Sequence, residues 1–150
     1  MTIRNCNFEN TYSLASIKAI RSRGGYVKNV CIENCTHFNH STEHHDCEWY
    51  RGAINIDSFY SHKEFNPDEK CPIDEGTPLV DGIVIKNITT ETVTGNAIFI
   101  CGLPEAPIKK LRLENVRAHG KCGMIKRNLE NEEFVSVQVT SDADLAQNLQ

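Results

Sequence analysis

Apolar and polar residues alternate in short runs along most of this chain. One pattern, apolar-x-x-apolar-x-apolar-x-Asn, occurs four times, over residues 3–10, 27–34, 80–87 and 108–115. Its apolar positions recur with a period of two, which is typical of β-strands. A second apolar run follows three of these segments, at residues 15–18, 54–57 and 98–101. The pattern therefore predicts an all-β chain, and only residues 142–149 show a weak helical period.

The spacing of the repeats predicts how the strands are arranged. The terminal asparagines, Asn10, Asn34, Asn87 and Asn115, are 24, 53 and 28 positions apart. Short strands that return at such a period are typical of stacked coils, each of which buries its apolar face against its neighbours. We therefore expect a β-solenoid of about four coils, with the four asparagines in a ladder of hydrogen-bonded side chains.

The same repeats predict a single domain over residues 1–150. The coils span 3–125, a Pro-rich polar segment at 62–78 forms an inserted loop, and 126–150 forms a C-terminal cap or tail with one alternating strand. The repeat begins at Ile3 without a cap of its own. We therefore expect either preceding coils or a partner that pairs edge to edge with the first strand.

Composition and charge narrow the classes of partner. There are 16 Lys and Arg against 20 Asp and Glu, a formal net charge of −4, so nucleic acid and anionic membranes are not expected partners. The longest apolar runs, of about five residues, are too short to span a bilayer. No apolar signal segment follows Met1, so the sequence as written predicts no export and a cytoplasmic location. The seven cysteines, an odd number, favour reduced thiols over a disulfide framework.

Several segments resemble the C-terminal half of the polygalacturonases, glycoside hydrolase family 28. The resemblance covers about residues 3–125 and rests on residues 14–20, 23–30, 52–60 and 102–108, which occur in the family's order. It implies a right-handed parallel β-helix of the single-stranded, pectin-lyase-like type. It also implies hydrolysis, with inversion, of the α-1,4-galacturonosyl bonds of pectin in carbohydrate metabolism.

The family's catalytic motifs do not occur in this chain. An inverting glycosidase needs one carboxyl group as acid and another as base. In the family these are aspartates of Asn-Thr-Asp and Asp-Asp motifs, followed by Gly-His-Gly, all upstream of an Arg-Ile-Lys motif. The Arg-Ile-Lys counterpart here is Ser16-Ile17-Lys18, and no aspartate precedes Asp46. We therefore expect no catalytic residue in this chain, and His119, which precedes Gly120, is predicted to lie in a turn.

Two residues match positions that bind substrate in the family. Lys18 corresponds to the lysine that meets a galacturonate carboxylate, and Tyr60 to a tyrosine placed near the sugar. Ser16 replaces the family's arginine, so the guanidinium of that site is missing. The alternative for Lys18 is a solvated side chain on the outer face of the strand. The alternative for Tyr60 is a half-buried residue at a strand end.

Two clusters of potential ligands or acids have simpler explanations. The first consists of Cys35, His37, His40, His44, His45 and Cys47. It could hold zinc, but the spacing matches no standard zinc pattern, and Cys35 falls at a core position. The second is a predicted outward column of Glu9, Glu33, Lys86 and Glu114, which we interpret as a solvated charge ladder rather than an acid–base pair. We expect no metal and no cofactor, and we expect Asp57 and Glu105 to be exposed.

Three functions remain open at this point. The first is a polygalacturonase-like hydrolase present as a C-terminal part and inactive alone, acting on pectin or oligogalacturonides. The second is a catalytically inactive carbohydrate-binding or structural β-helix module that keeps Lys18 and Tyr60. The third is a metal-binding interaction domain built on the Cys/His cluster.

Overall fold

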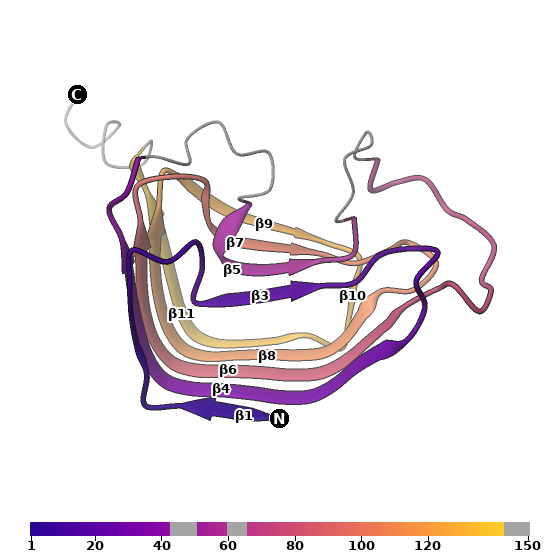
Figure 1. Cartoon of the computed structure of the whole chain (residues 1–150), viewed down its shortest axis with the longest axis horizontal. Helices are drawn as coiled ribbons and strands as arrows, with labels where there is room; N and C mark the ends of the chain where they lie inside the picture. The colour runs from indigo at the N-terminus through magenta and orange to yellow at the C-terminus, as the bar shows by residue number, and fades with distance from the viewer. Residues whose placement is uncertain (43–50, 60–65, 143–150) are drawn as a thin grey trace.

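The described secondary structure consists of strands, which form two parallel sheets (Figure 1). The computed structural model describes residues 1–42, 51–59 and 66–142. The strands of the first sheet are β1 (Thr2–Arg4), β2 (Asn7–Glu9), β4 (Tyr26–Asn39), β6 (Leu79–Thr92), β8 (Ile108–Gly120), β10 (Leu129–Glu130) and β11 (Glu133–Ser141). The strands of the second sheet are β3 (Ala15–Lys18), β5 (Gly52–Asp57), β7 (Asn96–Cys101) and β9 (Cys122–Arg127). The prediction of an all-β chain is thus confirmed.

The chain passes back and forth between the two sheets. A long strand of the first sheet is followed by a short strand of the second, as β4 is by β5, β6 by β7 and β8 by β9. We call one such pair a repeat unit. The units stack in chain order, and Figure 1 shows their long bent strands running side by side with β3, β5, β7 and β9 facing them. The predicted second strands at 15–18, 54–57 and 98–101 are confirmed, whereas β9 was not predicted.

Asparagines at sharp bends link the repeat units. Asn34, Asn87 and Asn115 all have a positive φ, between 51° and 54°, which bends each long strand without ending it. The Nδ2 group of Asn87 donates to Asn34 Oδ1 at 2.9 Å, and that of Asn115 donates to Asn87 Oδ1 at 2.9 Å. Asparagine is one of the few residues other than glycine that tolerates this backbone region. The predicted ladder therefore exists for these three residues.

The fourth member of the ladder is Asn5, and the prediction of Asn10 was wrong. The Nδ2 group of Asn34 donates to Asn5 Oδ1 at 3.3 Å. Backbone pairing places Arg4 opposite Glu33 and Asn7 opposite Thr36, an offset of 29 residues rather than the expected 24. Asn10 also has a positive φ, but its Oδ1 accepts a hydrogen bond from the backbone N–H of His40.

The corrected register puts Arg4, not Glu9, in the outward charge column beside the ladder. Two columns of the first sheet now alternate in sign from unit to unit: Arg4, Glu33, Lys86 and Glu114, then Lys28, Asp81, Lys109 and Glu130. Lys86 Nζ lies 2.8 Å from a Glu33 oxygen, and Lys109 Nζ lies 3.2 Å from a Glu130 oxygen. The less favoured alternative, an acid–base pair of Glu9 and Glu33, is therefore excluded, because these residues are not neighbours in the column.

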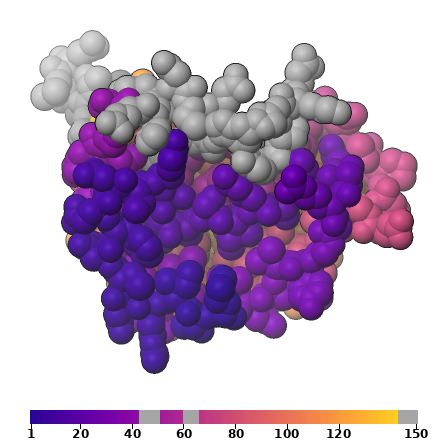
Figure 2. Space-filling view, viewed as in Figure 1, coloured from indigo at the N-terminus to yellow at the C-terminus, as the bar shows by residue number. Residues whose placement is uncertain are grey.

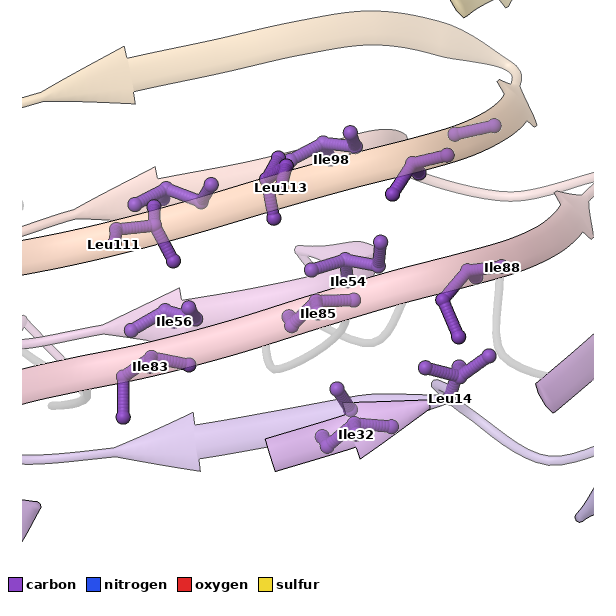
Figure 3. Close-up of a cluster of buried hydrophobic side chains, with 14 of the residues drawn as sticks. Leu14, Ile32, Ile54, Ile56, Ile83, Ile85, Ile88, Ile98, Leu111 and Leu113 are labelled. Atoms are coloured by element: carbon purple, nitrogen blue, oxygen red, sulfur yellow. The ribbon is translucent and has the colours of Figure 1, made fainter. Parts of the chain in front are cut away.

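Aliphatic side chains from both sheets fill the space between them. Ile54 and Ile56 of β5 lie against Ile83 and Ile85 of β6, and Ile98 of β7 lies near Leu113 (Figure 3). The largest of these side chains are fully buried. Each unit contributes apolar residues that its neighbours cover, so burial of apolar surface holds the stack together.

The segments at residues 62–78 and 142–149 were predicted to be a loop and a weak helix. Residues 66–78 contain turns and no strand, and this segment projects to one side of the sheets (Figure 1). The weak helical period at 142–149 falls almost wholly outside the described residues. Within the described part of the chain, no helix is long and apolar enough to cross a membrane.

Candidate functional site

Lys18 ends β3 on the outer face of the second sheet. Ile17 faces the core and Lys18 is exposed, as the period of two requires. The backbone N–H of Ala19 donates to Asp57 O at 2.9 Å, which keeps the strand end paired to β5. The end of β3 is therefore fixed, and Lys18 projects from a rigid element.

A tight turn brings two further side chains to the same place. Gly24 and Gly25 both have a positive φ, and the Gly24 N–H donates to Gly76 O at 2.9 Å. A Cβ atom on Gly24 would lie 2.3 Å from Glu75 O, so only glycine allows this approach of residues 74–77. The turn returns the chain to β4, and it places Arg23 and Tyr26 beside the end of β3.

These side chains surround a pocket of about 370 Å³. Its lining residues are Lys18, Ala19, Ile20, Arg23, Gly24, Tyr26, Val27, Pro78 and Leu79. Lys18 and Arg23 are cationic, and none of the described lining residues is a carboxylate. Tyr26 is 75% exposed, and Lys28 Nζ lies 5.3 Å from the centre of its ring. Figure 2 shows the N-terminal segment, in indigo, spread over the face toward the viewer.

The pocket combines features that suit an acidic sugar. A lysine and an arginine attract a carboxylate, and the guanidinium can bind both carboxylate oxygens. The exposed tyrosine offers an apolar ring face together with a polar hydroxyl, as surfaces that bind sugars and other amphipathic ligands require. The arrangement can therefore hold an anionic, ring-shaped ligand, and no described lining residue supplies a carboxyl group of the kind that an inverting glycosidase uses.

A larger groove lies along the bends of the first sheet and has a different character. It encloses about 570 Å³ and includes Lys110 and Arg112 but also Glu133 in its lining. Arg112 already forms ion pairs with Glu114 and Glu133. Lys110 Nζ lies 3.9 Å from an Asp81 oxygen, so both cations of the groove are already paired with carboxylates.

Asp57 lies beside Lys18 in the register of the second sheet but is buried, contrary to the expectation of an exposed carboxylate. Its side chain is 1% exposed, and its Oδ1 accepts a hydrogen bond from the Phe59 N–H at 2.7 Å. Arg51 Nε lies 3.3 Å from Oδ2, at ion-pair distance, although the geometry makes no hydrogen bond. Burial raises the pKa of Asp57, and the charges of Arg51 and Lys18 oppose that shift only in part.

Glu105 was also expected to be exposed, and it is instead held in a buried ion pair. Arg21 donates to both carboxylate oxygens, at 2.6 Å and 3.0 Å, and the Glu105 side chain is 1% exposed. The hydrogen bonds from Arg21 lower the pKa of Glu105. The Arg21 guanidinium also lies 5.3 Å from the Phe59 ring centre. These contacts fasten the segment after β7 to the turn that carries the pocket.

The structure describes three residues of the predicted Cys/His cluster, Cys35, His37 and His40, and they differ in burial. Cys35 is buried in the core, whereas His40 is exposed, and His44, His45 and Cys47 lie outside the described residues. His37 is fully buried, with its Nε2–H donated to Thr11 O at 3.0 Å and its Nδ1 accepting from the Thr90 hydroxyl at 2.7 Å. Burial lowers the pKa of His37. Within the described part of the chain, no group of three potential ligands could hold a metal ion.

Tyr60 and His119 are the other residues for which the sequence predicted a role or a position. Tyr60 lies outside the described residues, so its predicted role stays a prediction. His119 lies near the end of β8 rather than in a turn, and its ring nitrogens lie 2.9 Å from Thr140 Oγ1 and 3.2 Å from Asp142 Oδ1. The sequence motifs indicated Lys18 as a candidate binding residue but gave no indication of Arg23 and Tyr26. The adjacent glycines at 24 and 25 signal the turn that brings these two side chains to the pocket.

Comparison with protein-family models, with curated proteins and with solved structures finds no match to this chain. The resemblance to the polygalacturonases therefore rests on the sequence motifs alone.

Proposed function

We propose that the chain is a right-handed parallel β-helix that binds an acidic polysaccharide of the galacturonate type. The two parallel sheets, the alternation of strands between them and the asparagine ladder support a helical stack of repeat units. Connections between parallel strands of one sheet are right-handed in nearly all proteins, which supports the handedness.

The pocket formed by Lys18, Arg23 and Tyr26 is the observation that carries the proposed ligand. Lys18 matches the family's carboxylate-binding lysine. Ser16, which replaces the family's arginine, accepts a hydrogen bond from Asn55 Nδ2 at 3.3 Å and cannot supply a charge. Arg23 provides a guanidinium on the same pocket from a different element. We infer that Arg23 takes over the bidentate contact to the uronate carboxylate while Tyr26 contacts the sugar ring.

Calorimetric titration of the full chain with trigalacturonate tests this proposal. Loss of one charge-assisted contact costs about 1.5–3 kcal/mol, so Lys18→Ala should weaken binding by about ten- to a hundred-fold. Arg23→Lys keeps the positive charge but removes the planar guanidinium that can bind both carboxylate oxygens, so it should also weaken binding. Lys121→Ala, which removes an exposed lysine outside the pocket, is the matched control. Binding that is equal in wild type and Lys18→Ala, or equally strong for the fully methyl-esterified ligand, would refute the proposal.

The second candidate is a polygalacturonase-like hydrolase, favoured by the order of the family's motifs in the sequence. An inverting glycosidase needs two carboxyl groups about 6.5–9.5 Å apart with a water between them. Asp57 and Glu105, the buried carboxylates near the second sheet, are instead held by Arg51 and Arg21. We therefore expect that the chain alone releases no reducing ends from polygalacturonate. Release that persists through purification and disappears in Asp57→Asn would establish hydrolysis instead.

A further inference from the structure

Two cysteines stand opposite each other on neighbouring repeat units. Cys6 lies between β1 and β2, and Cys35 lies in β4. The pairs Arg4–Glu33 and Asn7–Thr36 flank them in register, and the Thr36 N–H donates to Cys6 O at 3.0 Å. Each cysteine directly follows a ladder asparagine and faces the core. The two thiols therefore begin a column that continues with the aliphatic residues Ile88 and Val116.

The two side chains have the same orientation. Cys6 Sγ lies 3.3 Å from Arg4 O, and Cys35 Sγ lies 3.2 Å from Glu33 O, so each thiol donates to the carbonyl two residues before it. Neighbouring strands are about 4.8 Å apart. This spacing falls within the range of about 4.4–6.8 Å between Cα atoms that a disulfide requires. Side chains that point the same way keep their Cβ atoms about 4.8 Å apart, slightly beyond the range of about 3.5–4.5 Å in disulfides, so bond formation requires rotation of both side chains and a local shift of the backbone.

The two thiols differ in access to solvent. Both are free thiols, but Cys35 is 1% exposed, while Cys6 is half-buried. An oxidant in solution therefore meets Cys6 first, and Cys35 lies behind it as the second thiol. This combination of an accessible thiol and a resolving thiol is the arrangement that reversible oxidation requires.

We propose that Cys6 and Cys35 form a reversible disulfide across the first two repeat units when the chain meets a peroxide. The Cys6 thiolate attacks one oxygen of hydrogen peroxide, the O–O bond breaks, and a sulfenic acid and hydroxide form. The Cys35 sulfur attacks the sulfenic sulfur, the S–O bond breaks, and the second hydroxide leaves as water with the proton of Cys35. In total, two thiols and one peroxide give one disulfide and two waters, and a dithiol reductant reverses the reaction.

The bond would enclose the side chains that the pocket takes from the first unit and the turn. The loop between residues 6 and 35 contains β3, the glycine turn and the start of β4, and thus Lys18, Arg23 and Tyr26. Strands β1 and β2 pair only with β4 among the described strands. A cross-link to β4 would therefore suppress local separation of β1 and β2 from β4. The inference does not depend on which ligand the pocket binds.

Peptide mapping of the oxidised full chain tests the proposal. Treatment of the reduced chain with stoichiometric hydrogen peroxide should lower its mass by 2 Da and yield a peptide pair joined through Cys6 and Cys35. The same pair should form in Cys122→Ser, the matched control that removes an exposed thiol, and should be absent in Cys6→Ser. If Cys6 instead carries a sulfinic acid, or is joined to a different cysteine, the proposal is wrong.

Hydrogen exchange supplies a second measurement that requires no mutation. In the disulfide form, backbone amides of β1 and β2 should exchange at least ten-fold more slowly than in the reduced form, and those of β8 should be unchanged. Cys35→Ala, which leaves a small apolar residue in the core, should trap the Cys6 sulfenic acid for labelling by dimedone. Equal exchange of β1 and β2 in both forms, or no labelling of Cys6 in this variant, would overturn the proposal.

Discussion

Ser136 stands at the ladder position in the last strand of the first sheet. Val135 pairs with Glu114 and Val137 with Val116, so Ser136 lies opposite Asn115, and its φ is 54°. The left-handed region costs an ordinary residue about 1 kcal/mol, whereas asparagine tolerates it better. Ser136 therefore bends the backbone as the ladder asparagines do, but it has no side-chain amide with which to continue the ladder of hydrogen bonds.

Replacing Ser136 with asparagine should stabilise the protein. Ser136→Asn relieves the backbone cost and adds an amide–amide hydrogen bond to Asn115, so the free energy of unfolding should rise by about 0.5–1.5 kcal/mol. Urea denaturation measures this change. Ser136→Ala, which adds no hydrogen bond, should give no gain. A Ser136→Asn variant no more stable than the wild type would show that the ladder ends at Asn115 without cost.

The ion pair between Arg21 and Glu105 should be strongly coupled to folding. Removing one partner of a buried pair leaves the other charge unsatisfied, so Arg21→Ala should lower the free energy of unfolding by about 3 kcal/mol. The double variant Arg21→Met/Glu105→Leu should lose less than Arg21→Ala alone, and exposed Arg23→Ala should leave stability nearly unchanged. Thermal and urea unfolding check both expectations. A loss from Arg21→Ala no larger than that from Arg23→Ala would contradict them.

The sequence pattern identified the ladder but not its first member. Asn5 and Asn10 both sit at bends, and Ile3 and Phe8 both fit the apolar position before a ladder asparagine. Only the backbone pairing of β1 with β4 decides between the two registers. Burial could not be predicted for Asp57 and Glu105 either, because the sequence does not reveal that Arg51, just before β5, and Arg21, in the turn after β3, lie against them.

At the scale of elements, β6 is the central strand of the first sheet. It pairs with β4 on one side and β8 on the other, and its Ile85 is fully buried opposite Ile32 and Leu113. The neighbouring Val84 faces outward in the same strand and is only partly buried. Substitutions at Ile85 and Val84 therefore distinguish the contribution of core packing to stability from the contribution of the strand itself.

Truncation at these two positions should have different effects. Ile85→Ala opens a cavity between three repeat units and should lower the free energy of unfolding by about 2–5 kcal/mol. Val84→Ala in the same strand should cost about 1 kcal/mol or less. Urea unfolding followed by circular dichroism measures both. Equal losses at the two positions would mean that Ile85 does not lie in a closely packed core.

Strand prediction succeeded where one face of an element is buried and failed where it is not. Strands β3, β5 and β7 place an apolar residue in the core at every second position, and β5 and β7 are buried along nearly their whole length, whereas most of β9 is exposed and carries Lys126 and Arg127. Polar residues at the end of a stack have no apolar period, so the pattern gave no signal for β9. Of the residues that line the pocket, only Lys18 was a candidate from the sequence, because Arg23 and Tyr26 lie in and after a turn rather than on a patterned strand.

For the molecule as a whole, two buried titratable groups give opposite pH dependences. His37 is buried as a neutral ring with a lowered pKa, so its contribution to stability is present above the unfolded value near 6.5 and is lost as the pH falls. Asp57 has a raised pKa, so ionising it opposes folding, and its contribution to stability is lost as the pH rises. The two effects partly offset each other in mildly acidic solution.

Variants should separate the two effects. His37→Gln should lose less stability than the wild type when the pH is lowered from 7.5 to 5.5, because no proton is taken up on unfolding. Asp57→Asn should lose less stability than the wild type when the pH is raised from 4 to 7. Urea midpoints measured at intervals over this range test both signs. Parallel curves for the wild type and His37→Gln would show that the ring is not buried as a neutral group.

The alternation of charge along the first sheet has a consequence for how such a chain can lengthen. Duplicating only the unit that holds β6 and β7 would set Lys86 beside a copy of itself and Asp81 beside another, and like charges directly opposite are unfavourable. Duplicating two consecutive units would preserve both alternating columns. Growth or engineering of this chain by tandem insertion should therefore give more stable products in even steps than in odd ones.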